Sequence, residues 1–564
     1  MVAVFNTCMM AGISEVPDYC NEIMTSGYQS VGDGGQGFYK RVYDDSQYSF
    51  DLITLNNKRF RPIGMISALQ FGADNTASSE DSETLKDGEN LAQKNAIALQ
   101  KFMDAIASGL FSEAKIPAGK YLCAAPIVAV SDKIMRLNVD ARGATIVFTT
   151  GVMESKRYFE ITNLSCLGEI LHISGLECRH NRPSSRIKNT DMVSYSGFDK
   201  YFVMSPIVSS SDNMGLVFGR RDSKKEFTPS SIYIENPMIG GWLPPQGQHE
   251  YGSIGDSGIW VVRAAKRTTI VNPYVRSTGD DGILVGETTD KGAGNVTITD
   301  ADIEDCGASG IKISVAKGRI TGRIVNTNGP ALYAIKLQGV TGDKLRVDLV
   351  IDKAGQLQAG EIGKKMIGKF DPVGICLVGA NTSQFDLEGT VIRNTFASAI
   401  VLRALEGQSL SHITGRVICD HIGYPSNGSE PKRDTGIINV GKSSKGTISD
   451  VDLELIVSNS QVPVLNWVSQ ANALSQKIHF KIRVKDHLLH SVFDKQALLS
   501  FSNMSLNLME NSLFSGVNAM SVTVDLDVIR GQFKTLLYAN DSKVYRRVKL
   551  WGRVDGKELV FKPE

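Results

Sequence analysis

A six-residue pattern that recurs along the middle of the chain decides the expected fold. Its copies are SGIWVV at 257–262, DGILVG at 281–286, SGIKIS at 309–314, YAIKLQ at 333–338, VGICLV at 373–378, SAIVLR at 398–403 and TGIINV at 435–440. Each copy has Gly or Ala in second place and Ile in third, and successive copies begin 24 to 40 residues apart. A recurrence of this length indicates a repeat architecture.

The segments between these copies alternate apolar and polar residues with a period of two, as in TTIVNPYV at 268–275 and VTITDADI at 296–303. That period is typical of β-strands and not of helices. Short strands repeating every ~24 residues predict an all-β chain, a right-handed parallel β-helix or solenoid. The third-position isoleucines would stack inside it as one ladder: Ile259, Ile283, Ile311, Ile335, Ile375, Ile400 and Ile437. A β-sandwich is the alternative, but seven copies in one register argue against it.

One convincing helix is expected near residues 88–109. Its apolar residues fall on a single face, and Gly109 suits the end of the helix. A helix here would cap the N-terminal end of the β-helix and cover an edge that otherwise invites aggregation.

Composition excludes several classes of protein. The 564 residues are 42% hydrophobic and 21% charged, which is ordinary for a folded chain and excludes wholesale disorder. The net charge of +1 lacks the basic excess of nucleic-acid binders. Eight scattered cysteines without a CxxC pair predict free thiols rather than a disulfide scaffold or a metal site. The first 17 residues make a poor signal peptide, and membrane insertion is not expected because no apolar run reaches ~18 residues.

Three motifs carry a resemblance to a known family. LQFGAD at 69–74 and IPAGKY at 116–121 flank the expected helix, and SGYQSVGDGGQGFYKRV lies upstream at 26–42. This arrangement resembles the start of the pectate-lyase-like right-handed β-helix superfamily, especially bacteriophage tailspikes and capsular polysaccharide depolymerases. The family's short acidic loop after FGAD is replaced here by a longer insertion at 75–89.

The resemblance implies a layout and a setting. Residues 1–66 would be a small N-terminal adaptor for attachment to the virion, 67–490 the β-helix, and 491–564 a C-terminal β-rich region for trimerisation or carbohydrate binding. The chain would be made in the host cytoplasm, assemble as a homotrimer on the phage tail, and act at the bacterial cell surface. Its expected partners are a bacterial surface polysaccharide and a tail or adaptor protein; no cofactor, metal or nucleic acid is expected.

Candidate chemistry lies in the turns. The repeat alignment places Asp256 and Asp280 in one column on successive coils, ~4.8 Å apart in rise. Two close carboxylates shift each other's pKa, as glycoside hydrolysis requires. GDDGI at 279–283 also resembles the double-aspartate motif of β-helical polygalacturonases, which adds Asp281, although Asp-Asp-Gly is equally good turn chemistry. Glu304 and Asp305 follow on the next coil as further catalytic candidates.

The candidate substrate-binding residues are Trp242, His249, Glu250, Tyr251 and Arg276. Four of them lie in the loop at 240–255, where aromatic rings would stack on sugars. Arg276 aligns beside Glu304. The two would either form an ion pair, or Arg276 would bind a sugar acid while Glu304 acts as the acid/base. The sequence therefore predicts a depolymerase that cleaves by carboxylate-mediated hydrolysis. The alternatives are a polysaccharide lyase, with His249, Tyr251 and Arg276 supplying base and cation, and a non-catalytic adhesin.

Overall fold

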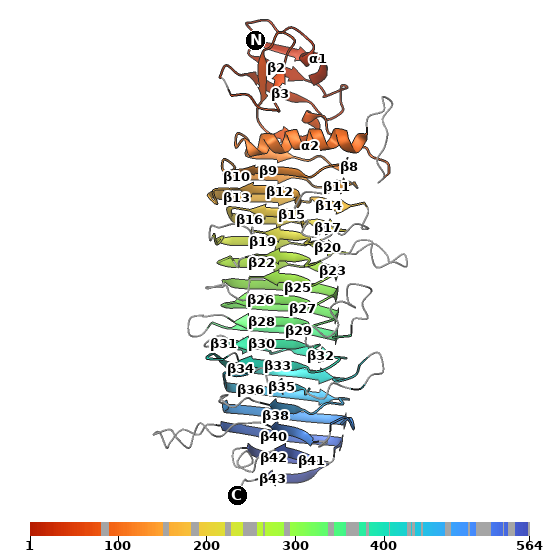
Figure 1. Cartoon of the computed structure of the whole chain (residues 1–564), viewed down its shortest axis with the longest axis vertical. Helices are drawn as coiled ribbons and strands as arrows, with labels where there is room; N and C mark the ends of the chain where they lie inside the picture. The colour runs from red at the N-terminus through yellow and green to blue at the C-terminus, as the bar shows by residue number, and fades with distance from the viewer. Residues whose placement is uncertain are drawn as a thin grey trace. The chain divides into compact units, whose positions relative to one another are not determined.

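The computed structural model consists of two compact units, residues 1–262 and 263–564 (Figure 1). It describes residues 1–561 except 45, 80–89, 150–156, 182–190, 212, 220–226, 241–255, 263–264, 287–293, 337–342, 357–371, 380–382, 405, 426–429, 431–434, 442–443, 469–474, 494–496, 503–519, 534 and 540–547.

The first unit opens with a small mixed sheet and one short helix, α1 (Cys8–Gly12). The strands, in spatial order, are β1 (Val2–Phe5), β2 (Glu22–Thr25), β3 (Gly37–Arg41), β5 (Arg59–Pro62) and β4 (Leu52–Ile53). Strands β1 and β2 run parallel, and the other neighbours are antiparallel. Its core includes Ile23, Tyr39 and Phe60, so the first 62 residues have a small core of their own.

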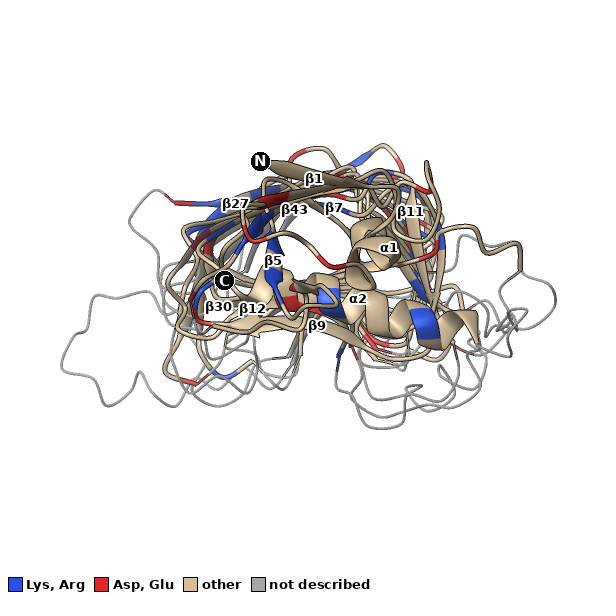
Figure 2. Ribbon diagram, turned by 90° about the horizontal axis from the view of Figure 1, so that it is seen from above, with Lys and Arg blue, Asp and Glu red and all other residues tan. Residues whose placement is uncertain are grey.

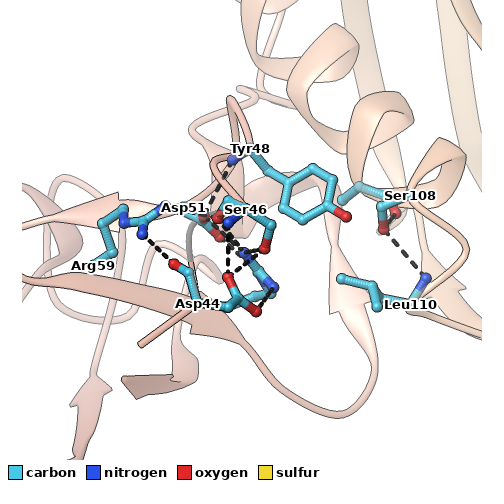
Figure 3. A network of polar contacts seen from close by, with 9 residues as sticks. Asp44, Ser46, Tyr48, Asp51, Arg59, Ser108 and Leu110 are labelled. Carbon is cyan, nitrogen blue, oxygen red and sulfur yellow. Dashed lines mark hydrogen bonds and ion pairs between the residues drawn. The ribbon is translucent and has the colours of Figure 1, made fainter. Parts of the chain in front are cut away.

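A polar network joins the loops of this N-terminal sheet (Figure 3). The carboxylate of Asp51 is fully buried and accepts from Arg61, with Nε 2.9 Å from Oδ1. Arg59 donates to the backbone carbonyl of Ser46 at 2.6 Å. Beside the network, Phe50 packs edge-on against Phe111 at the far end of the capping helix, with ring centroids 6.0 Å apart. The N-terminal sheet is therefore packed against the start of the β-helix.

The expected helix is present as α2 (Leu91–Ala107), which lies across the first coil (Figure 2). Asn90 caps it, and its side chain accepts from the amides of Ala92 and Gln93. Gly109 follows with φ +73°, a left-handed conformation that favours glycine. The buried face of α2 contacts β8 and β9 and includes Leu99, Phe102, Met103 and Ile106. The helix thus covers the N-terminal end of the coil, as the sequence predicts.

Unit 1 then builds coils of three strands each, and equivalent strands pair in parallel as three ladders. After β6 (Ile66–Ser67) and η1 (Ala68–Phe71), the first ladder contains β7 (Glu113–Lys115), β10 (Arg136–Asp140), β13 (Gly168–Ser174), β16 (Phe198–Met204) and β19 (Ser231–Glu235). The second contains β8 (Gly119–Cys123), β11 (Ala144–Phe148), β14 (Glu177–His180), β17 (Ile207–Ser209) and β20 (Met238–Gly240). The third contains β9 (Ile127–Ser131), β12 (Arg157–Asn163), β15 (Asp191–Ser196), β18 (Leu216–Phe218) and β21 (Ile259–Val261). Parallel ladders of this kind are the architecture of a parallel β-helix.

Unit 2 continues the same plan, but its first two ladders merge into long strands. Strands β22 (Arg267–Val271) and β23 (Tyr274–Thr278) both pair with β25 (Asn295–Cys306). The ladder proceeds through β27 (Lys317–Thr327), β29 (Leu345–Ala354), β31 (Ser383–Asp386), β32 (Thr390–Arg393), β34 (Ser409–Asp420), β36 (Thr447–Ser458), β38 (Ser475–Leu488), β40 (Met520–Gln532), β42 (Val548–Val554) and β43 (Lys557–Phe561). The other ladder contains β24 (Ile283–Val285), β26 (Ile311–Val315), β28 (Leu332–Lys336), β30 (Ile375–Gly379), β33 (Ile400–Ala404), β35 (Ile438–Val440), β37 (Leu465–Val468), β39 (Ala497–Ser502) and β41 (Thr535–Ala539).

The predicted aliphatic ladder exists in unit 2 with two corrections. Ile283, Ile311, Ile375 and Ile400 are fully buried in one column, but Leu332 takes the place expected for Ile335, and Ile438 the place expected for Ile437. Ile335 instead pairs with Val378 and packs in a satellite cluster with Tyr333 and Cys376. The repeat pattern selects Ile335 at 333–338 because an Ile stands in third place there. The residue in the inward column is Leu332, three residues earlier.

Described strands continue past residue 490. Strands β38, β40 and β42 pair in parallel, and β39 pairs with β41 in the same way. The strands on either side of the expected boundary thus belong to the same ladders, and a separate role for residues 491–564 stays a prediction.

Basic and acidic residues both lie along the ribbon of the coils (Figure 2). Lateral ion pairs join neighbouring coils, such as Arg323 with Asp302 at 2.8 Å and Arg393 with Asp352 at 3.2 Å. Such exposed pairs each contribute about 1 kcal/mol or less.

Candidate functional site

Trp242, His249, Glu250 and Tyr251 all lie outside the described residues. The other candidates are described: Asp256 in unit 1, and Arg276 and the remaining carboxylates in unit 2.

The double aspartate splits into one buried and one half-buried side chain. Asp281 is 1% exposed; the Ser309 amide donates to its Oδ1 at 3.1 Å, and its Oδ2 lies 3.3 Å from Lys312 Nζ. Burial raises the pKa of Asp281, and the charge of Lys312 opposes that shift. The two neighbours therefore face differently, as strand alternation predicts, and Asp281 is positioned to hold the turn together.

Close packing explains the glycine that follows the double aspartate. A Cβ on Gly282 would lie 2.6 Å from the Gly310 carbonyl and 2.9 Å from the sulfur of Cys306, on the next coil. The turn therefore lies directly against its neighbour. Asp280 is half-buried here, and its carbonyl accepts from the Ala308 amide at 2.9 Å. Both Asp280 and Asp281 raise the pKa of Lys312 against the opposing effect of burial.

Arg276 and Glu304 are register partners on β23 and β25, as the repeat alignment predicts. Arg276 Nε donates to Glu304 Oε2 at 3.0 Å, and Nη2 donates to the same oxygen. The guanidinium also lies over the ring of Tyr274, 5.5 Å from its centroid. Hydrogen bonding to Glu304 raises the pKa of Arg276. The arrangement is an ion pair across adjacent coils, on a surface that solvent reaches.

Asp305 adopts a left-handed conformation, with φ +59°. Its Oδ1 accepts from Asn326 on the next coil at 2.5 Å, and Asn326 has the same φ. The pair fits a repeated corner of the coil, so Asp305 has a structural part to play in addition to any chemical one.

Unit 1 contains a polar column that sequence reasoning missed in all but one member. Asp256 lies just before β21, and its amide donates to the Asn213 carbonyl at 2.9 Å. The side chain of Asn213 donates to Asp191 Oδ1 at 2.8 Å. Asp191 in turn is the register partner of Arg157, whose Nε lies 4.0 Å from Asp191 Oδ2. Residues at the start of the third-ladder strands or just before them thus form a continuous polar column.

Glu160 joins this column from the same strand as Arg157. It is 5% exposed, lies 3.6 Å from Arg157 Nη1, and accepts from Thr162 Oγ1 at 2.7 Å. Burial raises the pKa of Asp191 to about 6; Asn213 and Arg157 oppose that shift and the charge of Asp256 adds to it. A carboxyl with a pKa of about 6 can carry a proton near neutral pH, which an ordinary aspartate cannot.

The sequence offered one signal for these residues. Arg157 and Asp191 each begin an alternating strand, and Asp256 lies three residues before β21, as Asp280 lies three residues before β24. The signal was weak because β12 and β15 lack the Gly-Ile pair that marks the other copies.

Two further observations concern metal sites and membrane spans. Among the described residues, no three His, Cys, Asp or Glu side chains group as a metal site. The described helices include none of the length and apolarity that a membrane span needs.

Comparisons with known proteins find solved structures of low sequence identity. No protein-family model matches the sequence, and no curated protein matches it significantly. Similar solved structures include the enzymatically active domain of tailspike protein 2 from bacteriophage CBA120, with a TM-score of 0.38, 11% identity, and coverage of 92% of this chain and 63% of that one. The tailspike protein gp49 from Acinetobacter baumannii bacteriophage Fri1, a capsular polysaccharide depolymerase, has a TM-score of 0.44 and 11% identity, covering 97% and 78%.

A surface adhesin of Streptococcus pneumoniae, PfbA, also matches, with a TM-score of 0.29, 10% identity, and coverage of 74% and 90%. The chain spans less than two thirds of the length of the CBA120 structure. Phage tailspikes and depolymerases are the proteins that the opening motifs of the sequence resemble.

Proposed function

We propose that this chain is a phage tailspike depolymerase that hydrolyses a bacterial capsular or other surface polysaccharide. The proposal joins the tailspike-like opening motifs to a parallel β-helix whose turns carry acidic residues. We assign the acid/base chemistry to Asp280 and Glu304 of unit 2, with Asp281 holding the turn and Asp305 the corner. Asp256, in unit 1, stays a separate catalytic candidate. The chain's attachment to the virion through residues 1–66 and its action at the host surface belong to the same proposal.

One observation favours hydrolysis over a lyase reaction. β-Elimination from a uronic acid needs a cation to neutralise the sugar carboxylate, and Arg276 is the described residue proposed for that role. Its guanidinium is already paired with Glu304 on the next coil. A lyase would have to break this ion pair before the arginine could bind a sugar acid. Both contacts of Arg276 go to Oε2 of Glu304, so hydrolysis can use this carboxylate without breaking the pair.

The product decides the reaction class. Purified capsular polysaccharides should be incubated with the full chain, and both new reducing ends and absorbance from a conjugated double bond should be followed. Hydrolysis yields reducing ends without that absorbance, a lyase yields both, and an adhesin yields neither. Reducing ends without new absorbance are the expected result.

Amide variants then test the assigned residues. Asp280→Asn and Glu304→Gln keep the shape of the side chains and remove their acid/base function, so turnover should fall ~100-fold or more with little change in melting temperature. Asp302→Asn is the matched control, because Asp302 lies on the same strand as Glu304 and forms an exposed ion pair with Arg323. Full turnover by both amide variants would remove Asp280 and Glu304 from the site.

A further inference from the structure

The first ladder of unit 1 carries a row of aromatic rings on its outer face. His172 on β13, Phe202 on β16 and Tyr233 on β19 are register partners on three successive coils (Figure 1). Both sequence neighbours of each residue are buried, so strand alternation turns these three side chains outward. Phe202 is 36% exposed and the other two are half-buried, so solvent reaches the whole row.

The rings of this row contact one another. The centroids of His172 and Phe202 lie 6.3 Å apart with the rings nearly perpendicular, and those of Phe202 and Tyr233 lie 6.4 Å apart. Because a ring packs against it on each side, Phe202 is held in place while it stays open to solvent. The row is therefore a preorganised apolar surface, and binding to it costs little ordering of side chains.

Polar side chains extend the row at both ends. Asn138 on β10 is the register partner of His172, and its Nδ2 donates to Glu113 Oε2 at 2.8 Å. At the other end, the Tyr233 hydroxyl donates to Glu235 Oε2 at 3.0 Å. Amide, hydroxyl and carboxylate groups can each form more than one hydrogen bond, so both ends keep the capacity to bond a ligand.

The composition of the row matches a sugar chain. Cross-strand aromatic pairs can stabilise a sheet, but that role needs no polar groups at the two ends of a row. Ligand sites combine aromatic side chains with a few polar groups that fix the orientation of the ligand. A sugar ring offers the complementary surface, because its face carries C–H groups and its rim carries hydroxyls.

We propose that the row from Asn138 to Tyr233 is a non-catalytic binding site for the polysaccharide, which lies along the ladder across successive coils. The inference rests on the proposed function, because it takes the same polysaccharide as ligand. It adds a binding site in unit 1 to the acid/base residues assigned in unit 2.

The spacing of the ladder suits a ligand made of repeating units. Successive coils are ~4.8 Å apart, which is close to the length that one sugar unit adds to an extended glycan. A glycan that follows the ladder therefore meets about one side chain of the row per sugar unit. Phe202, the most exposed ring, provides the central apolar contact, and Asn138 and Glu235 are positioned to bond hydroxyl groups.

The central ring provides the sharpest test. Phe202→Leu keeps an apolar side chain and removes the ring, whereas Phe202→Trp keeps an aromatic ring. Retention of the full chain on immobilised, purified capsular polysaccharides should weaken roughly tenfold for Phe202→Leu, as expected for one lost aromatic contact, and should be preserved for Phe202→Trp. Met238→Leu is the matched control, because Met238 is 37% exposed and lies on β20, in the second ladder of the same unit.

Steady-state kinetics separate binding from catalysis. The row makes contacts that are the same before and during bond cleavage, so Phe202→Leu should raise the KM for a capsular polysaccharide that the parent cleaves, and kcat should change little. The melting temperature should stay near that of the parent, because leucine at this exposed position leaves no cavity in the core. A lower kcat with an unchanged KM would contradict a binding role for Phe202.

Oligomeric mass and product release distinguish the remaining outcomes. A changed mass of Phe202→Leu by light scattering would make the row a contact between subunits and overturn the inference. Parent-like retention and KM for Phe202→Leu, with a parent that cleaves the polysaccharide, would overturn the inference alone. A parent that is neither retained by the capsular polysaccharides nor releases product from them would reject the proposed function and this inference with it.

Discussion

At the scale of single residues, the pair of buried Asp281 and half-buried Lys312 shows how the turns are stabilised. Asp281 is almost fully buried, and it has one ion-pair partner and one backbone donor. Breaking a buried pair by removing one partner leaves an uncompensated charge, which typically costs about 3–5 kcal/mol. The pair therefore contributes to the register between β24 and β26.

We predict that Lys312→Met lowers the free energy of unfolding by ~3 kcal/mol or more at pH 7.5. The loss should be smaller near pH 4, because the raised pKa of Asp281 lets the carboxyl take a proton and become neutral there. Chemical denaturation at both pH values measures this. Lys317→Met, which breaks an exposed pair with Asp343, should cost ~1 kcal/mol or less at either pH.

The double variant Asp281→Asn with Lys312→Met completes the cycle. It removes both charges, so it should be more stable at pH 7.5 than Lys312→Met. Equal losses for the two variants would mean that Lys312 acts through packing rather than through its charge.

Residue-scale features also explain what the sequence did and did not predict about the site. Asp280, Asp281, Arg276 and Glu304 stand inside repeat copies or beside them, so aligning the copies predicted their neighbours on adjacent coils. Asp191 has no such marker. Its coil encloses the rings of Tyr195 and Phe218, and large inward side chains there replace the Gly-Ile pair. Because aromatic side chains fill this coil, the Gly-Ile pattern that marks the other copies is missing from its sequence.

At the scale of elements, columns of inward-facing side chains from successive coils stabilise the fold. Ile283 and Ile311 pair directly and are both fully buried. Small residues before them let the coils approach, as the close contact of Gly282 with Gly310 shows. The alternation of period two predicts these strands. It does not predict that Leu332 is the inward residue, since Ile335, three residues later, also fits the repeat pattern.

We predict that Ile311→Asp destabilises unit 2 by several kcal/mol, because it buries a charge without a partner. Ile418→Asp is the control: Ile418 lies on β34 in the same unit and is 39% exposed, so the new carboxylate reaches water. Thermal unfolding followed by circular dichroism compares the two. Equal melting temperatures would contradict an inward position for Ile311.

At the scale of the whole molecule, several large apolar side chains near the C-terminal end remain exposed in the single chain. Leu488, Ile529 and Trp551 are 48%, 51% and 40% exposed, and they lie on β38, β40 and β42. Each alternates with an inward residue of its strand and so points outward. The three are spread along their strands, because Trp551 is in register with Asp525 and Leu488 with Gln532. Exposed large apolar groups are typical of a surface that another protein covers. A second and third copy of the chain are the partners that the family resemblance implies.

We therefore expect a homotrimer, with a mass by light scattering of three times the 61.3 kDa chain. Trp551→Glu places a charge at one of these exposed apolar positions and should shift the mass toward the monomer as the protein is diluted, because subunit association follows mass action. Lys557→Glu, an exposed position on β43, is the control and should stay trimeric. A parent chain of monomer mass at every concentration would contradict the assembly. A glutamate buried in an apolar interface without a partner weakens subunit association. If Trp551→Glu leaves the trimer unchanged, the subunit contact therefore lies elsewhere.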